Sequence, residues 1–170
     1  MIKKNRPVYL CGFMGCGKSR IGREFAKRSG MTFADLDRYI VEHEGMKIPE
    51  IFEKYGESRF RDLESELILT IGKEGNTIVS CGGGVVVRPE NIEYMKKNGR
   101  VFYLKTSPET VYNRVKDSTN RPILNGNMNV EYIAGLMEKR RALYEGAADI
   151  TITTDGKSVD EITDEIIIAI

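Results

Sequence analysis

One stretch near the start of the chain has the residue types and the spacing that bind phosphate. Residues 12–19 read Gly-Phe-Met-Gly-Cys-Gly-Lys-Ser, which is the pattern G-x-x-x-x-G-K-S. Glycines let the backbone turn so that several N–H groups point at one anion, and the helix that follows adds the positive end of its dipole. In this motif Lys18 reaches the β- and γ-phosphates, and the Ser19 hydroxyl binds Mg²⁺. We therefore expect a bound nucleoside triphosphate, with contacts from Gly15, Cys16, Gly17, Lys18, Ser19 and Arg20.

Mg²⁺ in such a site also needs a supporting acid, commonly at the end of a later hydrophobic strand. The apolar run 77–80 ends without one, so the candidates are Asp35 and Asp37. Two carboxylates at positions i and i+2 of a strand end point the same way. One could help to hold Mg²⁺ while the other faces an acceptor hydroxyl. Asp37 would equally serve as the N-cap of a helix that begins at Arg38, and spacing alone favours neither reading.

Further along the chain, glycines and arginines suggest a place for the molecule that receives the phosphate. Gly82, Gly83 and Gly84 leave bare backbone against which a substrate can lie. An arginine can grip a carboxylate through two parallel hydrogen bonds. Most arginines on helices are simply solvated, but Arg121 sits inside the polar segment 117–129, which we expect to form a lid over the γ-phosphate. The arginine candidates are Arg59, Arg61, Arg114, Arg121, Arg140 and Arg141.

The elements that must position these residues alternate between strand and helix. Apolar, β-prone runs predict strands at 7–11, 31–34, 76–80, 100–105 and 149–153. Helical spacing predicts helices at 20–29, 38–44, 48–55, 57–73, 89–97, 108–116, 130–144 and 159–170, with Gly56 as a break. This alternation indicates an α/β fold with a parallel sheet covered on both faces. Ligands of such sheets gather at the carboxyl ends of the strands, where the candidate residues lie.

Composition limits the class of protein. The chain has 170 residues, 41% of them hydrophobic and 30% charged, which is typical of one soluble domain. A net charge of +1 gives no reason to expect nucleic-acid or membrane partners. Three cysteines and one histidine, His43, lack the spacing of a zinc site, and we expect a reduced, cytoplasmic protein that acts as a monomer.

Together these motifs identify a known family, because the chain resembles shikimate kinase over nearly its whole length. The phosphate loop is similar to the family's Gly-x-Met-Gly form, and Asp35-Leu36-Asp37 looks like its D-x-D. Residues 56–64 resemble its G-E-x-x-F-R-x-x-E motif. Gly82–Gly84, Arg121-Pro122-Ile123-Leu124 and the run 140–144 follow in the family's order and spacing. Each later motif is weak alone, but together they are specific.

The resemblance implies a function. It implies a three-layer P-loop fold like that of nucleoside monophosphate kinases, with a central five-stranded parallel sheet. It makes residues 1–170 one kinase domain, with a lid near 117–129 and a substrate-binding helical segment near 38–64. The activity that it implies is Mg²⁺- and ATP-dependent phosphorylation of the 3-hydroxyl of shikimate, in aromatic amino-acid biosynthesis. A related small-molecule kinase, for example one for gluconate, and a non-catalytic nucleotide-binding module are the alternatives.

The resemblance also assigns roles to single residues. Lys18, Asp37 and Arg121 would be catalytic, with Asp37 facing the accepting hydroxyl. Ser19 and Asp35 would support Mg²⁺, and Arg114 would pack on adenine. Glu64 would hold Arg61 in place, and Ile48, Phe52 and Phe60 would surround the substrate ring. The implied shikimate contacts are Asp37, Arg61, Gly82, Gly83, Gly84 and Arg140.

Overall fold

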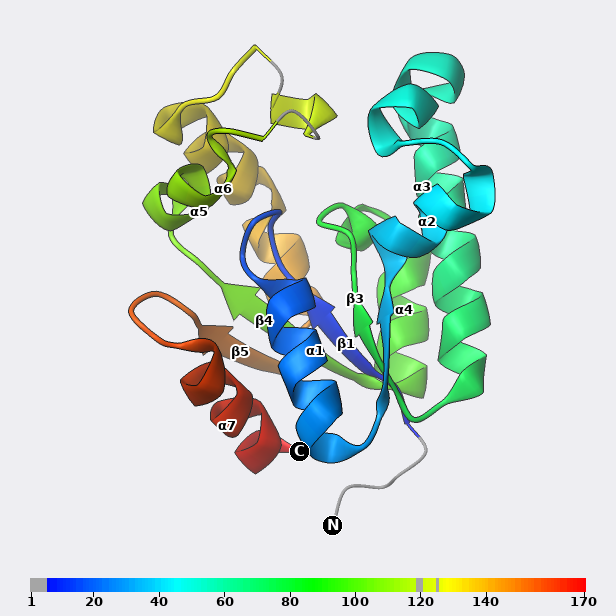
Figure 1. The fold of residues 1–170 in the computed structure, drawn as a ribbon, viewed down its shortest axis with the longest axis vertical. Helices are drawn as coiled ribbons and strands as arrows, with labels where there is room; N and C mark the ends of the chain where they lie inside the picture. The colour runs from blue at the N-terminus through cyan, green and yellow to red at the C-terminus, as the bar shows by residue number, and fades with distance from the viewer. Residues whose placement is uncertain (1–5, 119–120, 125) are drawn as a thin grey trace.

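A five-stranded parallel sheet runs through the centre of the molecule in the computed structural model (Figure 1), which describes residues 6–118, 121–124 and 126–170. The strand order is β2-β3-β1-β4-β5, and every neighbouring pair is parallel. The strands are β1 Val8–Cys11, β2 Thr32–Asp35, β3 Thr77–Ser80, β4 Arg100–Lys105 and β5 Ile150–Thr153. All their carboxyl ends therefore meet at one edge of the sheet.

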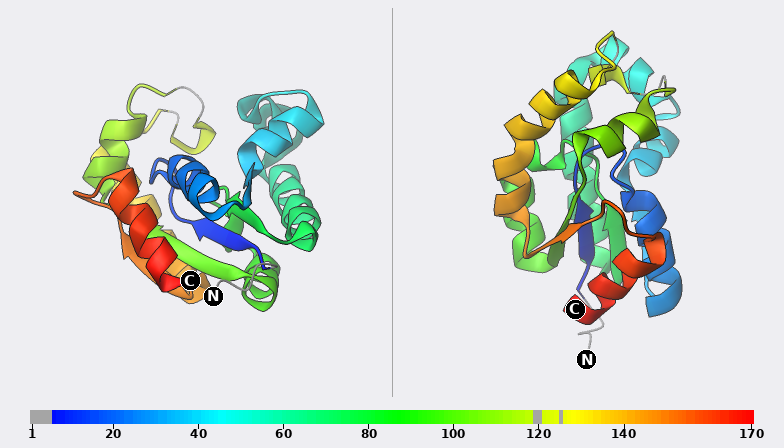
Figure 2. Two further views of the ribbon diagram at one scale, coloured as in Figure 1. Left: turned by 60° about the horizontal axis from the view of Figure 1, so that its bottom comes forward. Right: turned by 90° about the vertical axis from the view of Figure 1, so that its left-hand side faces the viewer.

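Helices cover both faces of the sheet (Figure 2), and the alternation of strand side chains explains why. Val8 and Leu10 of β1 pack into one apolar cluster, with α1 (Lys18–Ser29) and α7 (Val159–Ala169). Tyr9 and Cys11 pack into the other, with α3 (Ile48–Glu74), α4 (Pro89–Asn98) and α6 (Val130–Ala147). A strand that is buried on both faces reads as a continuous apolar run, as β1 does.

Two groups of elements extend beyond the carboxyl edge and face each other across it (Figure 1). One is α2 (Leu36–Glu44) with the first part of α3, which a small apolar cluster joins around Ile51. Gly56, at φ 80°, kinks α3 where we predicted a break between two helices. The other group is α5 (Pro108–Val115) with a 3₁₀ turn at Pro122–Leu124.

The predicted strands and helices are confirmed, with differences of at most three residues at their ends, and the helices predicted at 48–55 and 57–73 form the one kinked helix α3. Two short 3₁₀ turns, Val85–Val87 and Pro122–Leu124, were not predicted. Of the expected lid, Thr119, Asn120 and Asn125 lie outside the described residues, as do residues 1–5 of the expected domain. No helix within the described ranges is both long and apolar enough to cross a membrane.

Candidate active site

The phosphate-binding loop joins β1 to α1 at the carboxyl edge of the sheet. Gly15 and Gly17 have φ values of 76° and 96°, a left-handed backbone that favours glycine. Lys18 is buried, and its Nζ donates hydrogen bonds to the backbone carbonyls of Gly12 and Phe13 at 2.8 and 3.0 Å. The ammonium group is therefore held inside the curve of the loop.

A pocket of about 1020 Å³ opens around this loop, and its charged walls are mainly positive. Arg114, on α5, donates from Nη1 to the carbonyl of Gly15 at 3.0 Å and so lies against the loop. Positive side chains around a glycine loop and a helix N-terminus suit a polyphosphate. The cationic residues that line this nucleotide pocket are Lys18, Arg20, Arg23, Arg114 and Arg121.

Oxygen ligands gather at one side of the nucleotide pocket. The Ser19 hydroxyl donates a hydrogen bond to Asp35 and lies 3.1 Å from the hydroxyl of Ser80. Mg²⁺ takes hydroxyl and carboxylate oxygens, usually together with waters and substrate phosphates. Within the described part of the chain, no group of three or more His, Cys, Asp or Glu residues could hold a metal ion. The donor set fits an Mg²⁺ ion that is shared with a bound polyphosphate.

The structure corrects the expected geometry of the two aspartates. Asp35, not Asp37, caps α2, because its Oδ1 accepts a hydrogen bond from the backbone N–H of Arg38 at 3.2 Å. Asp37 lies in the first turn of that helix. The strand alternation that we used to align the carboxylates was wrong, since Leu36 already begins the helix. Both aspartates nevertheless line the nucleotide pocket.

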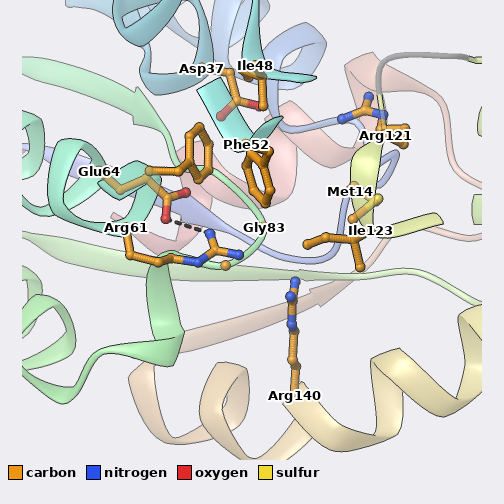
Figure 3. Close-up of a pocket in the computed structure, with 12 residues that line it drawn as sticks. Met14, Asp37, Ile48, Phe52, Arg61, Glu64, Gly83, Arg121, Ile123 and Arg140 are labelled. Carbon is orange, nitrogen blue, oxygen red and sulfur yellow. Dashed lines mark hydrogen bonds and ion pairs between the residues drawn. The ribbon is translucent and has the colours of Figure 1, made fainter. Parts of the chain in front are cut away.

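A second pocket, with about 460 Å³ of empty space, opens beside the first, and we call it the acceptor pocket (Figure 3). Asp37 and Arg140 lie at opposite ends of it in this view, with the ring of Phe52 between them. Its apolar wall is formed by Met14, Ile48, Phe52, Phe60 and Ile123. Its charged lining is formed by Asp37, Arg61, Glu64, Arg121 and Arg140. Such a mixture suits a small, polar, ring-shaped molecule that carries negative charge.

Arg61 is fixed in this acceptor pocket by two acids of its own helix. Its Nη1 donates to Glu64 Oε2 at 2.6 Å, and its Nη2 donates to Glu57 Oε1 at 2.9 Å. A Cβ atom on Gly84 would lie only 2.1 Å from Arg61 Nη1, and one on Gly82 would lie 2.3 Å from Glu64 Oε1. We predicted these glycines as bare backbone for a substrate, but they also make room for this ion pair.

Several polar atoms around the acceptor pocket are buried without a hydrogen-bond partner among the described residues. They are Arg61 Nε, Glu64 Oε1, Arg121 Nε and Arg140 Nη1. Arg140 lies beside the ring of Phe13, with Cζ 5.9 Å from the ring centroid. Unpaired buried donors are rare in folded proteins, and a guanidinium binds a carboxylate strongly. The pocket is therefore equipped to bind an anionic group.

Burial raises the pKa of both carboxyl groups in the acceptor pocket. It raises the pKa of Glu64 to about 7, although the Arg61 guanidinium opposes this change. Burial also raises the pKa of Asp37, and the charge of Asp35 adds to the effect, while three nearby cations oppose it. A raised pKa makes the Asp37 carboxylate a better proton acceptor than an ordinary surface aspartate.

The two pockets share a wall. Met14, Asp37, Gly83 and Arg121 line both of them. A ligand in the acceptor pocket can therefore meet a ligand in the nucleotide pocket beside one carboxylate and one guanidinium. This is the arrangement that direct group transfer between two bound molecules requires.

Two of the arginine candidates point elsewhere. Arg59 pairs with Glu44 and Glu66, while Arg141 pairs with two glutamates of its own helix. Arg140 is the member of its pair that lines the acceptor pocket. His43 is exposed, and Cys16 is buried with its Sγ 3.6 Å from Lys18 Nζ.

The expected lid segment contributes to both pockets. Arg121 lines both, and Ile123 lines the acceptor pocket. Leu124 is fully buried and belongs to the apolar core. Met128, near the end of the segment, also packs against this core, so the described part of the segment is attached to the core while Arg121 and Ile123 reach the site.

Sequence reasoning gave no role to Ser80, Met14, Ile123 or Tyr144. The hydroxyl of Tyr144 donates to the carbonyl of Gly83, which holds one wall of the acceptor pocket in place. The sequence could have indicated a role for Tyr144 through its position four residues after Arg140, since residues at that spacing share one face of a helix. The other three could not be found from spacing.

The chain is similar to several known proteins. The family model described as shikimate kinase matches residues 14–170. A shikimate kinase from Thermodesulfovibrio yellowstonii is 44% identical over 162 residues, which cover 95% of this chain and 93% of the relative. A solved shikimate kinase from Acinetobacter baumannii, in complex with shikimate, aligns with a TM-score of 0.93 at 32% identity, covering 97% and 92% of the two chains. A gluconokinase from Sinorhizobium meliloti 1021 shares only the fold, with a TM-score of 0.60 at 15% identity and coverages of 95% and 89%.

Proposed function

The chain belongs to the shikimate kinase family, and we propose that it transfers the γ-phosphoryl group of ATP to the 3-hydroxyl group of shikimate, giving shikimate 3-phosphate and ADP. The observation that carries the proposal is the wall shared by the two pockets, which includes Asp37 and Arg121. An acceptor in one pocket would meet the γ-phosphate in the other at this wall.

The charges of the acceptor pocket support one orientation of shikimate. Its carboxylate would bind Arg61 and Arg140, which have buried donors available, and its ring would lie against Phe52 and the other apolar residues. Its 3-hydroxyl would then point toward Asp37, at the opposite end of the pocket from Arg140 (Figure 3). Gly82, Gly83 and Gly84 would contact the substrate through their backbone.

Transfer would proceed by positioning and charge stabilisation. Asp37 would accept a hydrogen bond from the 3-hydroxyl and take its proton as the oxygen bonds to phosphorus and the bond to ADP breaks. Lys18 and Arg121 would neutralise charge on the phosphoryl oxygens during this step. Both cations line the nucleotide pocket, and Arg121 also reaches the acceptor pocket, which supports these roles.

The nucleotide would be held by the loop and by α5. Gly15, Cys16, Gly17, Lys18 and Ser19 would surround its phosphates, with Arg20 and Arg114 beside them. Ser19 and Asp35 would hold Mg²⁺, which would offset the negative charge of the phosphate oxygens when bound.

The wider setting is also part of the proposal. The enzyme would act in the cytoplasm, in aromatic amino-acid biosynthesis. Its three cysteines are free thiols, as a reducing compartment keeps them. We also propose that it acts as a monomer.

Two alternatives make different demands on the acceptor pocket. A gluconate kinase shares the fold, but gluconate is an open chain that gains nothing from the ring-sized apolar wall around Phe52. A non-catalytic nucleotide-binding module would not need the buried pair of Arg61 and Glu64. Neither alternative is favoured by the family to which the chain belongs.

The test is the rate of ADP release by the purified protein with ATP and Mg²⁺, measured with shikimate, with gluconate and with no acceptor. We expect fast release only with shikimate, loss of activity after chelation of Mg²⁺, and ³¹P resonances of a phosphate monoester on the product. Equal rates with and without shikimate would refute the proposed function.

A further inference from the structure

One acidic side chain outside both pockets is tied to the first turn of α5. Asp155 follows β5, and its carboxylate accepts two hydrogen bonds from Ser107, at 3.0 Å from the backbone N–H and 2.9 Å from the hydroxyl. It also accepts one from the hydroxyl of Thr110 at 2.7 Å. Ser107 is the N-cap of α5. Burial tends to raise the pKa of Asp155, but these hydrogen bonds outweigh it and lower the pKa, so the carboxylate stays charged.

A pair of buried hydroxyl groups extends this connection beneath the aspartate. Thr106 and Thr154 are both buried, and their hydroxyl oxygens are 2.6 Å apart. The backbone N–H of Thr154 also donates to the carbonyl of Lys105 at 2.9 Å. The loop after β4 and the loop after β5 are therefore fixed to each other at the carboxyl edge of the sheet.

The other end of α5 touches the phosphate-binding loop. Arg114 donates to the carbonyl of Gly15, and a Cβ atom on Gly15 would lie 2.7 Å from Val115 and 3.7 Å from Val111. The helix thus contacts Asp155 at its start and the phosphate-binding loop at its end. Its C-terminal half is held by apolar packing, and its N-terminal half is held by the aspartate.

A side pocket with about 540 Å³ of empty space is lined by the phosphate loop, α1, the end of α5, the loop after β5 and α7. Arg114 lines one wall, and Lys157, two residues after Asp155, lines another. Gly17, Arg20 and Arg114 line both this side pocket and the nucleotide pocket. A nucleotide whose phosphates occupy the phosphate loop can therefore extend its nucleoside part into the side pocket.

We propose that Asp155 is a positioning residue for the nucleoside part of ATP. By joining the start of α5 to the loop after β5, it sets the distance between the walls that carry Arg114 and Lys157. This role rests on the proposed function, because it presumes that ATP is the phosphate donor. Asp155 lines neither the nucleotide pocket nor the side pocket, so it acts through α5 and its own loop.

An aspartate at the other end of β5 provides a matched control. Asp149 precedes β5, and its Oδ2 accepts a hydrogen bond from the backbone N–H of Val101 at 2.8 Å. This bond joins the start of β5 to β4, at the end of β5 that is far from the phosphate loop, whereas Asp155 joins the loop after β5 to α5. Removing either carboxylate costs hydrogen bonds between neighbouring segments, but only Asp155 bonds to the first turn of α5.

The experiment compares Asp155→Ala, Asp149→Ala and the milder Thr110→Val by calorimetry and initial rates. We expect Asp155→Ala to raise the dissociation constant and the KM for ATP by about tenfold, since misplaced binding groups lose affinity. Thr110→Val should raise both by a few-fold. The shikimate KM should be unchanged for both variants. Inorganic tripolyphosphate, which needs only the phosphate loop, should bind all variants as it binds the unmodified protein.

Two outcomes would overturn the proposal. One is an ATP affinity of Asp155→Ala that matches that of Asp149→Ala. The other is an equal loss of tripolyphosphate and ATP affinity, which would place the effect on the phosphate loop. If Asp155→Ala does not fold, Thr110→Val alone tests the proposal, by comparison of its loss of ATP affinity with its loss of tripolyphosphate affinity. Because ATP binding is measured without an acceptor, failure of shikimate turnover would refute the proposed function and leave this test standing.

Discussion

Replacing Gly84 with alanine should weaken shikimate binding without unfolding the protein. The backbone of Gly84, at φ −99° and ψ 6°, accepts an alanine without strain. The new Cβ atom would lie 2.1 Å from Arg61 Nη1 and 2.3 Å from Cζ. The clash is with the end of a flexible side chain, so the guanidinium can move while the fold remains.

The required movement sets the size of the effect. An ordinary contact needs at least 3.4 Å, so Nη1 must shift by about 1.3 Å, which is the difference between this distance and 2.1 Å. Such a shift disrupts the 2.6 Å hydrogen bond to Glu64 and displaces the proposed carboxylate ligand. A misplacement of about 1 Å can cost on the order of 100-fold in activity, and we expect a 10- to 100-fold loss of shikimate affinity.

Calorimetry with shikimate and initial rates at saturating ATP will measure this loss. The matched control is Gly135→Ala in α6, where an added Cβ meets nothing within 4 Å. That variant should keep its shikimate affinity and gain roughly 0.5–1 kcal/mol in free energy of unfolding. If Gly84→Ala binds shikimate within twofold of the unmodified protein, Arg61 does not hold the carboxylate.

Three further predictions concern single residues of the site. Lys18→Ala should abolish turnover but leave shikimate binding without nucleotide intact, and an equal loss of affinity in calorimetry would contradict its assignment to the phosphates. Asp37→Asn should lower kcat far more than shikimate affinity, whereas a change confined to KM would remove its role in transfer. The pKa of Glu64 is 4.5 in the unfolded chain and is raised by burial to about 7 in the folded protein. Between these pH values the folded protein therefore holds a proton that the unfolded chain has lost. Its free energy of unfolding falls as pH rises through that window. Glu64→Gln should flatten this fall, by at most about 3 kcal/mol, and parallel denaturation curves between pH 4 and 8 would refute the burial argument.

Much of the fold could be predicted because local chemistry and tertiary packing agree. The five strands are short β-prone runs that are bounded by glycines and polar residues. Gly45 ends α2 and Gly56 kinks α3, both at positive φ values that favour glycine. Helix ends were less certain. α6 continues to Ala147 because Tyr144 and Ala147 are buried in the core, and core packing cannot be read from local spacing.

The site also contains residues whose roles the sequence predicts and residues whose roles it does not. Lys18 and Ser19 could be placed from the motif, because the chemistry of phosphate binding fixes their spacing. The N-cap of α2 could not, since Asp35 and Asp37 both have the right side chain and only the end of β2 decides between them. The role of Gly84 beside Arg61, and that of Asp155 beside Ser107, depend on contacts between residues 23 and 48 positions apart.

The central claim is that Arg61 and Arg140 hold the carboxylate of shikimate, so that its 3-hydroxyl reaches Asp37. The most direct measurement is the affinity of shikimate and of its methyl ester for the unmodified protein and for Arg61→Lys, by calorimetry without nucleotide. Lysine keeps the charge but loses the planar pair of donors, and the ester removes the same interaction from the ligand. Each change alone should lower affinity by roughly one to three orders of magnitude, and the two together should cost much less than the sum of their free energies. If the two losses add fully, the guanidinium does not touch the carboxylate and the proposed orientation is wrong.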